Sequence, residues 1–341
     1  MTDSFGFLIF TFIAVLGFEA VNGWTDAPNA VATVVSTRAL PPFVAVAMAA
    51  VLNFVGALSA WFLGSAVAKT IGSGIIDIDQ ISSEGVGGGL EIAAAAALAV
   101  VLWSSLAAYF GLPTSESHGL VAGLAGAAIG VAGTDVLLWA GWQKVFTGVG
   151  MAVVFGFAGA FLVMIAILWL FQKANPSATR RLFVPLQIGS AAFMAWSHGT
   201  ADGQKAIGVM AFTLAIWNDT PADEFSVPLW IILLAAGTMG ISTMAGGWRI
   251  IRTLGMRVTH LETYQGFAAE AAAATTLTVT ANLGIPLSTT HTIGSAIMGV
   301  GSTRRLSAVR WGVAYNIVLA WIVTFPICFA LAWAITILIP S

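Results

Sequence analysis

Apolar segments about as long as a bilayer is thick follow one another along almost the whole chain. A membrane-spanning helix needs about 20 apolar residues, and some of the stretches are too short to cross fully. Only 8% of the 341 residues are charged, against about 25% in soluble domains. The sequence therefore predicts an all-α polytopic membrane protein of the cell inner membrane and excludes a water-soluble globule. The stretches are Phe5–Val21 with a broken continuation to Thr37, Phe43–Leu63, Ile92–Phe110, Gly119–Ala132, Val145–Phe171, Val184–Trp217, Val227–Trp248, Gly266–Leu283, Thr292–Val300 and Trp311–Ile339.

Charge and cysteine content exclude other functional classes. The 13 Lys and Arg against 15 Asp and Glu leave a formal charge of −2, and no basic run could neutralise the phosphates of a nucleic acid. The single cysteine, Cys328, permits neither an internal disulfide nor a Cys-based metal site. No Gly-x-Ser-x-Gly motif supports a hydrolase. We therefore expect no enzyme, no resident cofactor and no nucleic-acid partner.

The positions of the basic residues predict the orientation in the membrane. Cytoplasmic loops carry the excess of Lys and Arg, whereas the stretches around Asp77, Asp135 and Asp219 are acidic and should face outside. This orientation places both termini outside. It makes residues 92–132 a hairpin from the outer face and residues 266–300 a hairpin from the inner face. Four connections hold ten of the 13 basic residues, namely Arg38; Lys173, Arg180 and Arg181; Arg249, Arg252 and Arg257; and Arg304, Arg305 and Arg310.

Each hairpin has a polar tip that contains Gly and Pro, at residues 111–118 (GLPTSESH) and 284–291 (GIPLSTTH). If the hairpins cross the membrane fully, the tips lie on opposite surfaces. If the hairpins are re-entrant, both tips meet near the midplane, where non-helical backbone survives only inside protein or beside a water-filled cavity. We favour the re-entrant interpretation.

A short internal repeat supports this arrangement. Residues 22–31 (NGWTDAPNAV) align without gaps with residues 198–207 (HGTADGQKAI), and the tips align at nearly the same offset. Transporters are often built from inverted repeats. We therefore predict one transport domain of two inverted-topology repeats, residues 1–171 and 184–341, joined by a cytoplasmic linker at residues 172–183. Each repeat should contain a broken helix with an aspartate and a re-entrant helical hairpin.

Two aspartates, Asp26 and Asp202, occupy matching positions in this repeat. An ionised carboxylate inside the membrane is costly unless it is paired or hydrated, so each aspartate either caps a broken helix or binds a coupling cation or proton. Asn29 and Lys205 follow three residues later, which places them on the same helical face as the aspartates. This pairing favours the functional interpretation, and Asp26, Asn29 and Asp202 are candidate sodium ligands.

Hydroxyl side chains gather at both tips, directly before a helix. A helix N-terminus presents free backbone N–H groups and partial positive charge, which suit an anion, although a hydroxyl there can also cap the helix. Two such helix starts that converge from opposite faces favour a small tetrahedral anion held mostly by neutral donors. The candidate substrate-binding residues are Ser115, Ser117, Ser288, Thr289, Thr290, Asn29 and Lys205.

The acids near this anion predict cation coupling. Asp26, Asp202 and Glu116 add negative charge to an anion such as phosphate, and Lys205 alone offsets it, so protons, sodium ions or a divalent metal carried with phosphate should enter too. Glu270, deep in the second hairpin, is a further candidate for proton coupling or a carboxyl group hydrogen bonded to a neighbouring turn. Three histidines beside the site either bind directly or hydrogen bond to backbone, namely His118, His198 and His291.

At these residues the chain resembles the PiT family of inorganic phosphate transporters, whose signatures contain Gly-Ala-Asn-Asp-x-x-Asn and whose hairpins contain Gly-Leu-Pro-x-Ser-x-Ser/Thr-His. The resemblance covers nearly the whole chain. It implies a homodimeric inverted-repeat transporter with both termini outside, in which the Asp boxes and tip hydroxyls bind phosphate and coupling cations. The residues that match position by position are Asp26, Asn29, Ser115, Ser117, Asp202, Ser288, Thr289 and Thr290.

The chain also departs from the family pattern. Thr25 and Ala201 replace the signature Asn, and Lys205 replaces the later Asn of the second repeat. A fixed ammonium group can take the place of a sodium ion, so we expect a phosphate symporter coupled to protons rather than to sodium. Because some bacterial relatives carry sulfate, a sulfate or related oxyanion permease is the alternative. The uncharged tip hydroxyls argue against a third function, a cation exchanger or channel.

Overall fold

In the computed structural model, which describes residues 2–83 and 85–338, the chain is almost entirely helical. The predicted all-α membrane architecture is confirmed, because five helices are long and apolar enough to cross a membrane. The N-terminal half forms α1 (Thr2–Ser36), α2 (Pro42–Leu58), α3 (Ala60–Leu63), α4 (Ala66–Ser73), α5 (Ile78–Ser83), α6 (Val86–Tyr109), α7 (Glu116–Ala132) and α8 (Trp139–Leu170). The C-terminal half forms α9 (Pro176–Trp217), α10 (Leu229–Thr243), α11 (Trp248–Arg252), a π-helical turn (Thr253–Arg257), α12 (Thr263–Asn282), α13 (Thr289–Ser302) and α14 (Trp311–Leu338).

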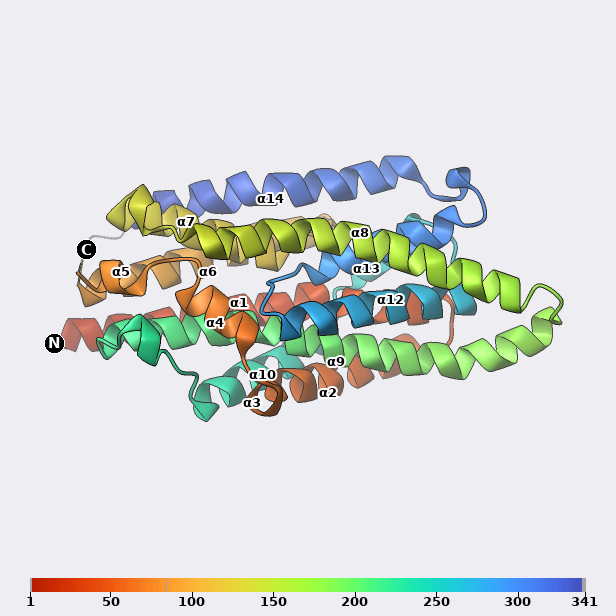
Figure 1. The fold of residues 1–341 in the computed structure, drawn as a ribbon, viewed down its shortest axis with the longest axis horizontal. Coiled ribbons are helices and arrows are strands. Elements are labelled where there is room, and N and C mark those ends of the chain that lie inside the picture. The colour runs from red at the N-terminus through yellow and green to blue at the C-terminus, as the bar shows by residue number, and fades with distance from the viewer. Residues whose placement is uncertain (1, 84, 339–341) are drawn as a thin grey trace.

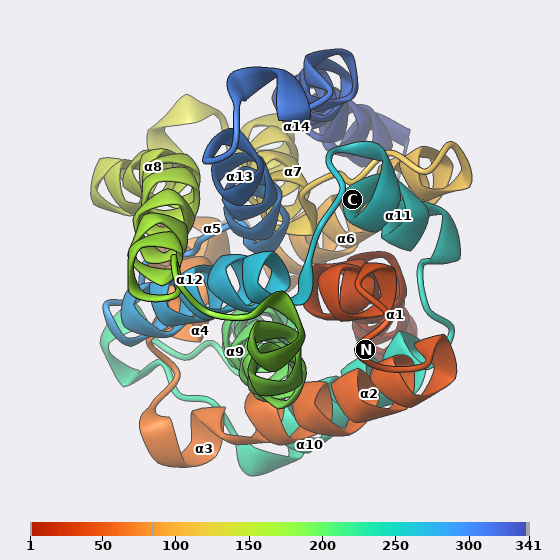
Figure 2. The ribbon, with the colours of Figure 1, turned by 90° about the vertical axis from the view of Figure 1, so that its right-hand side faces the viewer.

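The helices run along one long axis of the molecule (Figure 1), and Figure 2 looks along that axis. Helix α1 begins and α14 ends at the same end of the bundle, which we call the terminal end. The α8–α9 connection lies at the opposite end, which we call the linker end and which faces the viewer in Figure 2. Residues 339–341, which include the predicted end of the last span, lie outside the described residues.

Helices α1 and α9 are continuous, so the prediction that both spans are broken at the Asp boxes is wrong. Pro28 removes one backbone hydrogen bond from α1, but its ring lies against Gly247 of the neighbouring segment, and such packing lets a transmembrane helix continue through a proline. In α9, Gly199 permits a close approach to α2, because a Cβ atom there would clash with the backbone of Asn53. The glycines of this box serve packing rather than a helix break.

The two helical hairpins, α6–α7 and α12–α13, enter from opposite ends and turn inside the bundle (Figure 1). Their tips meet there. The Ser117 hydroxyl donates to the Leu287 carbonyl oxygen at 3.4 Å, and the rings of His118 and His291 lie 4.4 Å apart between centroids. This contact between the tips is what the re-entrant interpretation predicts, and full crossings would not produce it.

Each tip is held in the same way by a short helical segment of the other half. The backbone of Gly111 has φ +70°, and its carbonyl oxygen accepts a hydrogen bond from the Thr253 hydroxyl at 2.8 Å. The backbone of Gly284 has φ +65°, and its carbonyl oxygen accepts one from the Thr70 hydroxyl at 2.8 Å. Glycine adopts this left-handed conformation without steric cost. The returning helices also pack in a matching way, α7 against α14 and α13 against α8.

The connection between the two halves is shorter than the predicted linker at residues 172–183. Helix α9 begins at Pro176, and proline suits the first position of a helix because its missing N–H has no partner there anyway. Asn175 caps this end by accepting a hydrogen bond from the Ser177 amide at 2.9 Å. Residues 176–183 are therefore the first turns of α9.

Candidate substrate and cation site

Most of the predicted site residues meet where four helical segments converge inside the bundle. Helices α1 and α9 contribute the middle of each helix, and α7 and α13 contribute their first turns. None of these residues is more than 3% exposed. The site is therefore closed to solvent in this structure. Its members are Thr25, Asp26, Asn29, Glu116, Ser117, His198, Asp202, Lys205, Thr289 and Thr290.

Ser115 and Ser288 lie at the two helix starts as caps. The Ser115 hydroxyl oxygen accepts a hydrogen bond from the His118 amide at 3.2 Å, and Ser288 does the same for the His291 amide at 3.2 Å. Both serines therefore cap a helix, and their predicted part in substrate binding stays a prediction. By capping, they orient the first turns of α7 and α13, whose next residues enter the site.

The hydroxyls of α13 connect the two aspartates. Thr290 donates to Asp26 Oδ1 at 2.9 Å, and Asn29 Nδ2 donates to the Thr290 hydroxyl at 3.0 Å. The Thr289 hydroxyl lies 3.3 Å from Asp26 Oδ2 and 3.2 Å from Asp202 Oδ2. A hydroxyl has a single proton to donate, so Thr289 can satisfy one of the two carboxylates at a time.

Lys205 joins the second aspartate to the opposite hairpin. Its ammonium group donates to Asp202 Oδ1 at 2.6 Å and to the hydroxyl of Ser117. The Lys205 side chain is 1% exposed, and a buried ammonium group requires such a charged partner. Lys205 therefore lies between an acid of α9 and a predicted substrate hydroxyl of α7.

Glu116 reaches the site from the first turn of α7. Thr25 of α1, which directly precedes Asp26, donates to Glu116 Oε1 at 2.8 Å. The Asp26 and Glu116 residues are both buried, at 3% and 1% exposure. Two buried carboxyl groups that reach the same site repel each other when both are ionised, so a proton on one of them would be favoured.

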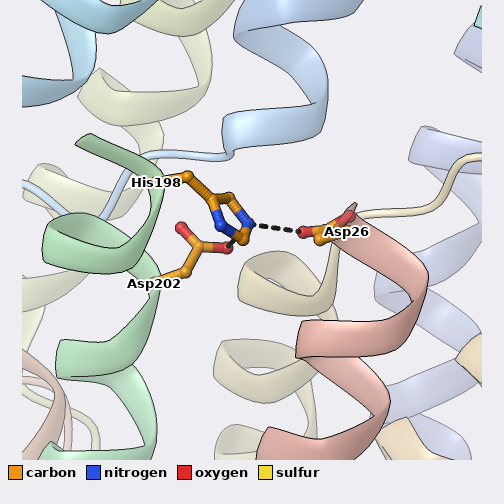
Figure 3. Close-up of side chains that lie close together, drawn as sticks. All are labelled: Asp26, His198 and Asp202. Carbon is orange, nitrogen blue, oxygen red and sulfur yellow. Dashed lines mark ion pairs between the residues drawn. The ribbon is translucent and has the colours of Figure 1, made fainter. Parts of the chain in front are cut away.

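His198 completes a candidate cation site that the sequence did not identify as such. Its Nε2 atom lies 3.6 Å from Asp202 Oδ2 and 3.9 Å from Asp26 Oδ2 (Figure 3). Its Nδ1 atom lies 3.0 Å from Asn53 Oδ1, while Asn53 Nδ2 donates to Thr243 at 2.9 Å. This arrangement assigns the proton to Nδ1 and turns the lone pair of Nε2 toward the carboxylates. The three side chains can bring their ligand atoms within 4.8 Å of one another, as a metal ion requires.

The charges of the site do not balance by themselves. Three carboxyl groups, from Asp26, Glu116 and Asp202, face one ammonium group. Uncompensated charge inside a membrane protein is costly. Protons on the acids or a cation between Asp26, Asp202 and His198 would restore the balance. The donors Lys205, Asn29 and the hydroxyls could then bind an anion.

Glu270 lies apart from these residues. Its carboxyl oxygens accept hydrogen bonds from the hydroxyls of Thr33 and Ser190, and its side chain is fully buried between α1, α9 and α12. Thr33 is seven residues from Asp26 along α1, which is about 10 Å at 1.5 Å per residue. Glu270 is therefore a single buried acid on the linker side of the central site, held by two hydroxyls, and is separate from that site.

Sequence reasoning missed two contributors to the site. Thr25 was noted only as a departure from a signature, and Asn53, which sets the orientation of the His198 ring, was not identified at all. A signal for Asn53 was present, because it is the one amide in the apolar run of residues 43–63. A buried amide in a membrane helix requires a hydrogen-bonding partner.

Comparisons with known proteins agree with this picture. Residues 22–332 match the model of the phosphate transporter family. A probable low-affinity inorganic phosphate transporter of Rhizobium meliloti is 40% identical over 325 residues, which cover 95% of this chain and 94% of the relative. A protein of the same description from Bacillus subtilis is 36% identical and covers 92% of both chains. A solved structure described as a sodium-dependent phosphate transporter has the same fold, with a TM-score of 0.89 over 98% of each chain and 23% identity.

Proposed function

The chain belongs to the phosphate transporter family, and from this premise we propose that it imports inorganic phosphate across the inner membrane by symport with cations. The observation that supports the proposal is the buried cluster of side chains at the two hairpin tips, where neutral donors and one ammonium group meet three acids. Such a cluster can bind an anion when cations neutralise the acids.

The hydrogen bonds of the site suggest how phosphate and cations are coupled. The Thr289 and Thr290 hydroxyls and the Lys205 ammonium group donate to Asp26 or Asp202. A proton or cation on these acids removes the acceptors and frees the same donors for phosphate oxygens. Each ligand then favours the other, because binding free energies of coupled sites are reciprocal.

We propose protons as the coupling ion. The buried carboxyl groups of Asp26, Glu116 and Asp202 support this choice, because protons on them would offset their mutual repulsion. Lys205 supports it as well, since its ammonium group already supplies positive charge beside Asp202. The fold resemblance to a sodium-dependent transporter concerns the architecture, and sodium at Asp26, Asn29 and Asp202 is the alternative.

In a variant of this proposal, a divalent metal travels with phosphate and binds at the same central site. The Asp26, His198 and Asp202 ligand atoms can converge on one ion. An imidazole nitrogen in the set favours a transition metal such as zinc over magnesium or calcium, which prefer oxygen ligands. In this variant of the proposal the metal is part of the substrate, and its charge replaces that of the protons.

The acids also favour phosphate over sulfate. Phosphate at neutral pH retains protons that can be donated to Asp26, Asp202 or Glu116, whereas sulfate has none to donate. A buried acceptor left without a donor costs free energy, so sulfate would leave the carboxylates unsatisfied. The related oxyanion permease therefore remains the second candidate function.

The matching contacts of the two halves support an inverted-repeat transporter with alternating access. Thr253 holds Gly111 and Thr70 holds Gly284 by equivalent hydrogen bonds, and each hairpin enters from a different end (Figure 1). Releasing one tip would open the site to one side of the membrane. The homodimer implied by the family resemblance remains a prediction, which light scattering of the purified protein would test.

Uptake of radiolabelled phosphate into proteoliposomes tests the proposed function. An inward proton gradient without sodium should drive uptake, excess unlabelled sulfate should compete weakly, and the Asp202→Asn variant should show background counts. If uptake follows a sodium gradient alone, the coupling ion is sodium rather than protons. Competition by sulfate but not by phosphate would favour the oxyanion permease, and phosphate-independent ion flux would favour the channel or exchanger.

A further inference from the structure

We propose a second anion site, at which the pocket between the first hairpin tip and α11 binds a phosphate group. The pocket has a volume of about 370 Å³ and is lined by Tyr109, Phe110, Gly111, Arg249, Arg252 and Arg257. It is separate from the central site, which contains none of these residues. The phosphate group can belong to free inorganic phosphate or to the headgroup of an anionic lipid. This inference does not depend on transport by the central site.

The π-helical turn after α11 brings the arginines together. In a regular α-helix with 3.6 residues per turn, Arg252 and Arg257 would point about 140° apart. The turn Thr253–Arg257 is instead π-helical, and its wider i to i+5 pattern lets residues five apart face the same side. Both guanidinium groups line the pocket as a result.

The packing of this turn fixes its position. A Cβ atom on Gly255, in the middle of the turn, would lie 3.1 Å from the Ser36 side chain and would clash with the backbone of α1. The turn therefore rests directly on the end of α1. Because irregular π-helical turns often occur at functional sites, a fixed turn of this kind is a suitable frame for a binding pocket.

The guanidinium groups lack acidic partners. Arg249 donates to the Tyr109 carbonyl oxygen and stacks on the Tyr109 ring at 4.6 Å from its centroid. In the part of the chain that the structure describes, no carboxylate lies within 4 Å of Arg249, Arg252 or Arg257. Arginine forks match the geometry of phosphate oxygens. A phosphate group would supply the negative charge that this cluster lacks.

The opposite tip shows that docking a hairpin does not require arginines. Gly284 is held by the Thr70 hydroxyl and packs against Ala66, and α4 contains one basic residue, the exposed Lys69. The hydrogen bond is the same length as that of Thr253 with Gly111. The three arginines beside Gly111 are therefore an addition to the docking contact. Basic residues near a membrane surface also set orientation, but orientation does not require them to line one pocket.

A fluorescent label at the rim of the pocket tests the proposal. Met256 is 53% exposed and adjoins Arg257, and Cys328 is fully buried, so the Met256→Cys variant can be labelled selectively. In nanodiscs of phosphatidylcholine alone, inorganic phosphate should change the fluorescence and the change should saturate. Arg252→Gln with Arg257→Gln should weaken this response at least tenfold. Arg181→Gln with Arg305→Gln, which removes two exposed arginines elsewhere, should preserve it.

A second arm distinguishes lipid from free phosphate. For this arm, the protein is taken from nanodiscs that contain phosphatidylglycerol and is measured by native mass spectrometry. If a lipid headgroup occupies the pocket, the control variant should retain bound lipid, and the variant with Arg252→Gln and Arg257→Gln should not. Either response supports the site and identifies its ligand. If the pocket variant and the control behave alike in both arms, the site does not exist. The Asp202→Asn variant should lose uptake yet keep the response, so failure of the transport proposal would be seen separately.

Discussion

At the scale of single residues, the central site depends on acids that share their hydrogen-bond donors. Asp202 accepts from Lys205 at 2.6 Å and lies within reach of the Thr289 hydroxyl. Asp26 accepts from Thr290 at 2.9 Å. Neither aspartate is bound to a water-exposed group. Their charge state therefore controls whether the donors are free for an anion.

Replacing Asp202 with asparagine tests this control. Asp202→Asn keeps the size of the side chain but removes its charge and its capacity to take up a proton, so coupled phosphate uptake should fall at least about tenfold. Expression and Tm should stay near those of the parent protein. Asp219→Asn is the matched control, because Asp219 is exposed and asparagine tolerates its φ of +53°. Uptake that survives in Asp202→Asn would remove this residue from the coupling mechanism.

Replacing Lys205 changes the ion that the site needs. In Lys205→Asn the ammonium group beside Asp202 and Ser117 is lost, so a sodium ion can take its place next to the carboxylate. We expect uptake that becomes stimulated by sodium. Rates measured at several sodium concentrations and fixed pH would show it. The same cation dependence as in the parent protein would mean that Lys205 is structural.

At the scale of elements, glycines set how closely α9 approaches its neighbours. Gly199→Ala should lower the free energy of unfolding by about 1–3 kcal/mol, because the new methyl group would clash with the backbone of Asn53 in α2. Gly189→Ala on the same helix is the control, since nothing lies within 4 Å of its Cβ position. Thermal unfolding in detergent measures both. Equal Tm values for the two variants would contradict the proposed close contact.

The sequence predicts where the helices lie better than it predicts whether each helix is continuous. Hydropathy located the apolar segments, and basic residues with Gly-Pro tips indicated the hairpins. The continuous course of α1 and α9 was not predicted, because Pro28 and the glycines of the second box resemble helix breakers until their packing partners, Gly247 and Asn53, are known. Long-range packing decides such positions, and it is absent from local composition.

At the scale of the whole molecule, the two tip contacts should determine to which side of the membrane the central site opens. A hydrogen bond contributes about 0.5–1.5 kcal/mol, so removing one should shift the populations of two conformations about two- to tenfold. Thr253→Val releases the first tip, and Thr70→Val releases the second. We expect the two variants to change cysteine accessibility of the site in opposite directions. A shift in the same direction for both would contradict alternating release.

The central site itself could be predicted in part. The matched spacing of Asp26 with Asp202 and of the two tips indicated that they meet, and the structure brings these residues together. The sequence alone does not show that Glu270 lies apart from the site, or that Ser115 and Ser288 cap helices. A buried acid has the same local sequence pattern inside or outside a site, and a hydroxyl at a helix start has the same pattern whether it caps the helix or binds substrate.

The lone proton of the Thr289 hydroxyl has a consequence for turnover. In the unloaded carrier, one of Asp26 and Asp202 must go without this donor whenever both are ionised. That arrangement is electrostatically unfavourable. If cations neutralise both acids in the loaded carrier, as proposed, the unloaded carrier should reorient more slowly than the loaded one. Swapping labelled for unlabelled phosphate across the membrane should accordingly proceed faster than net accumulation, and measuring the two fluxes in the same vesicles would reveal which half of the cycle limits the rate.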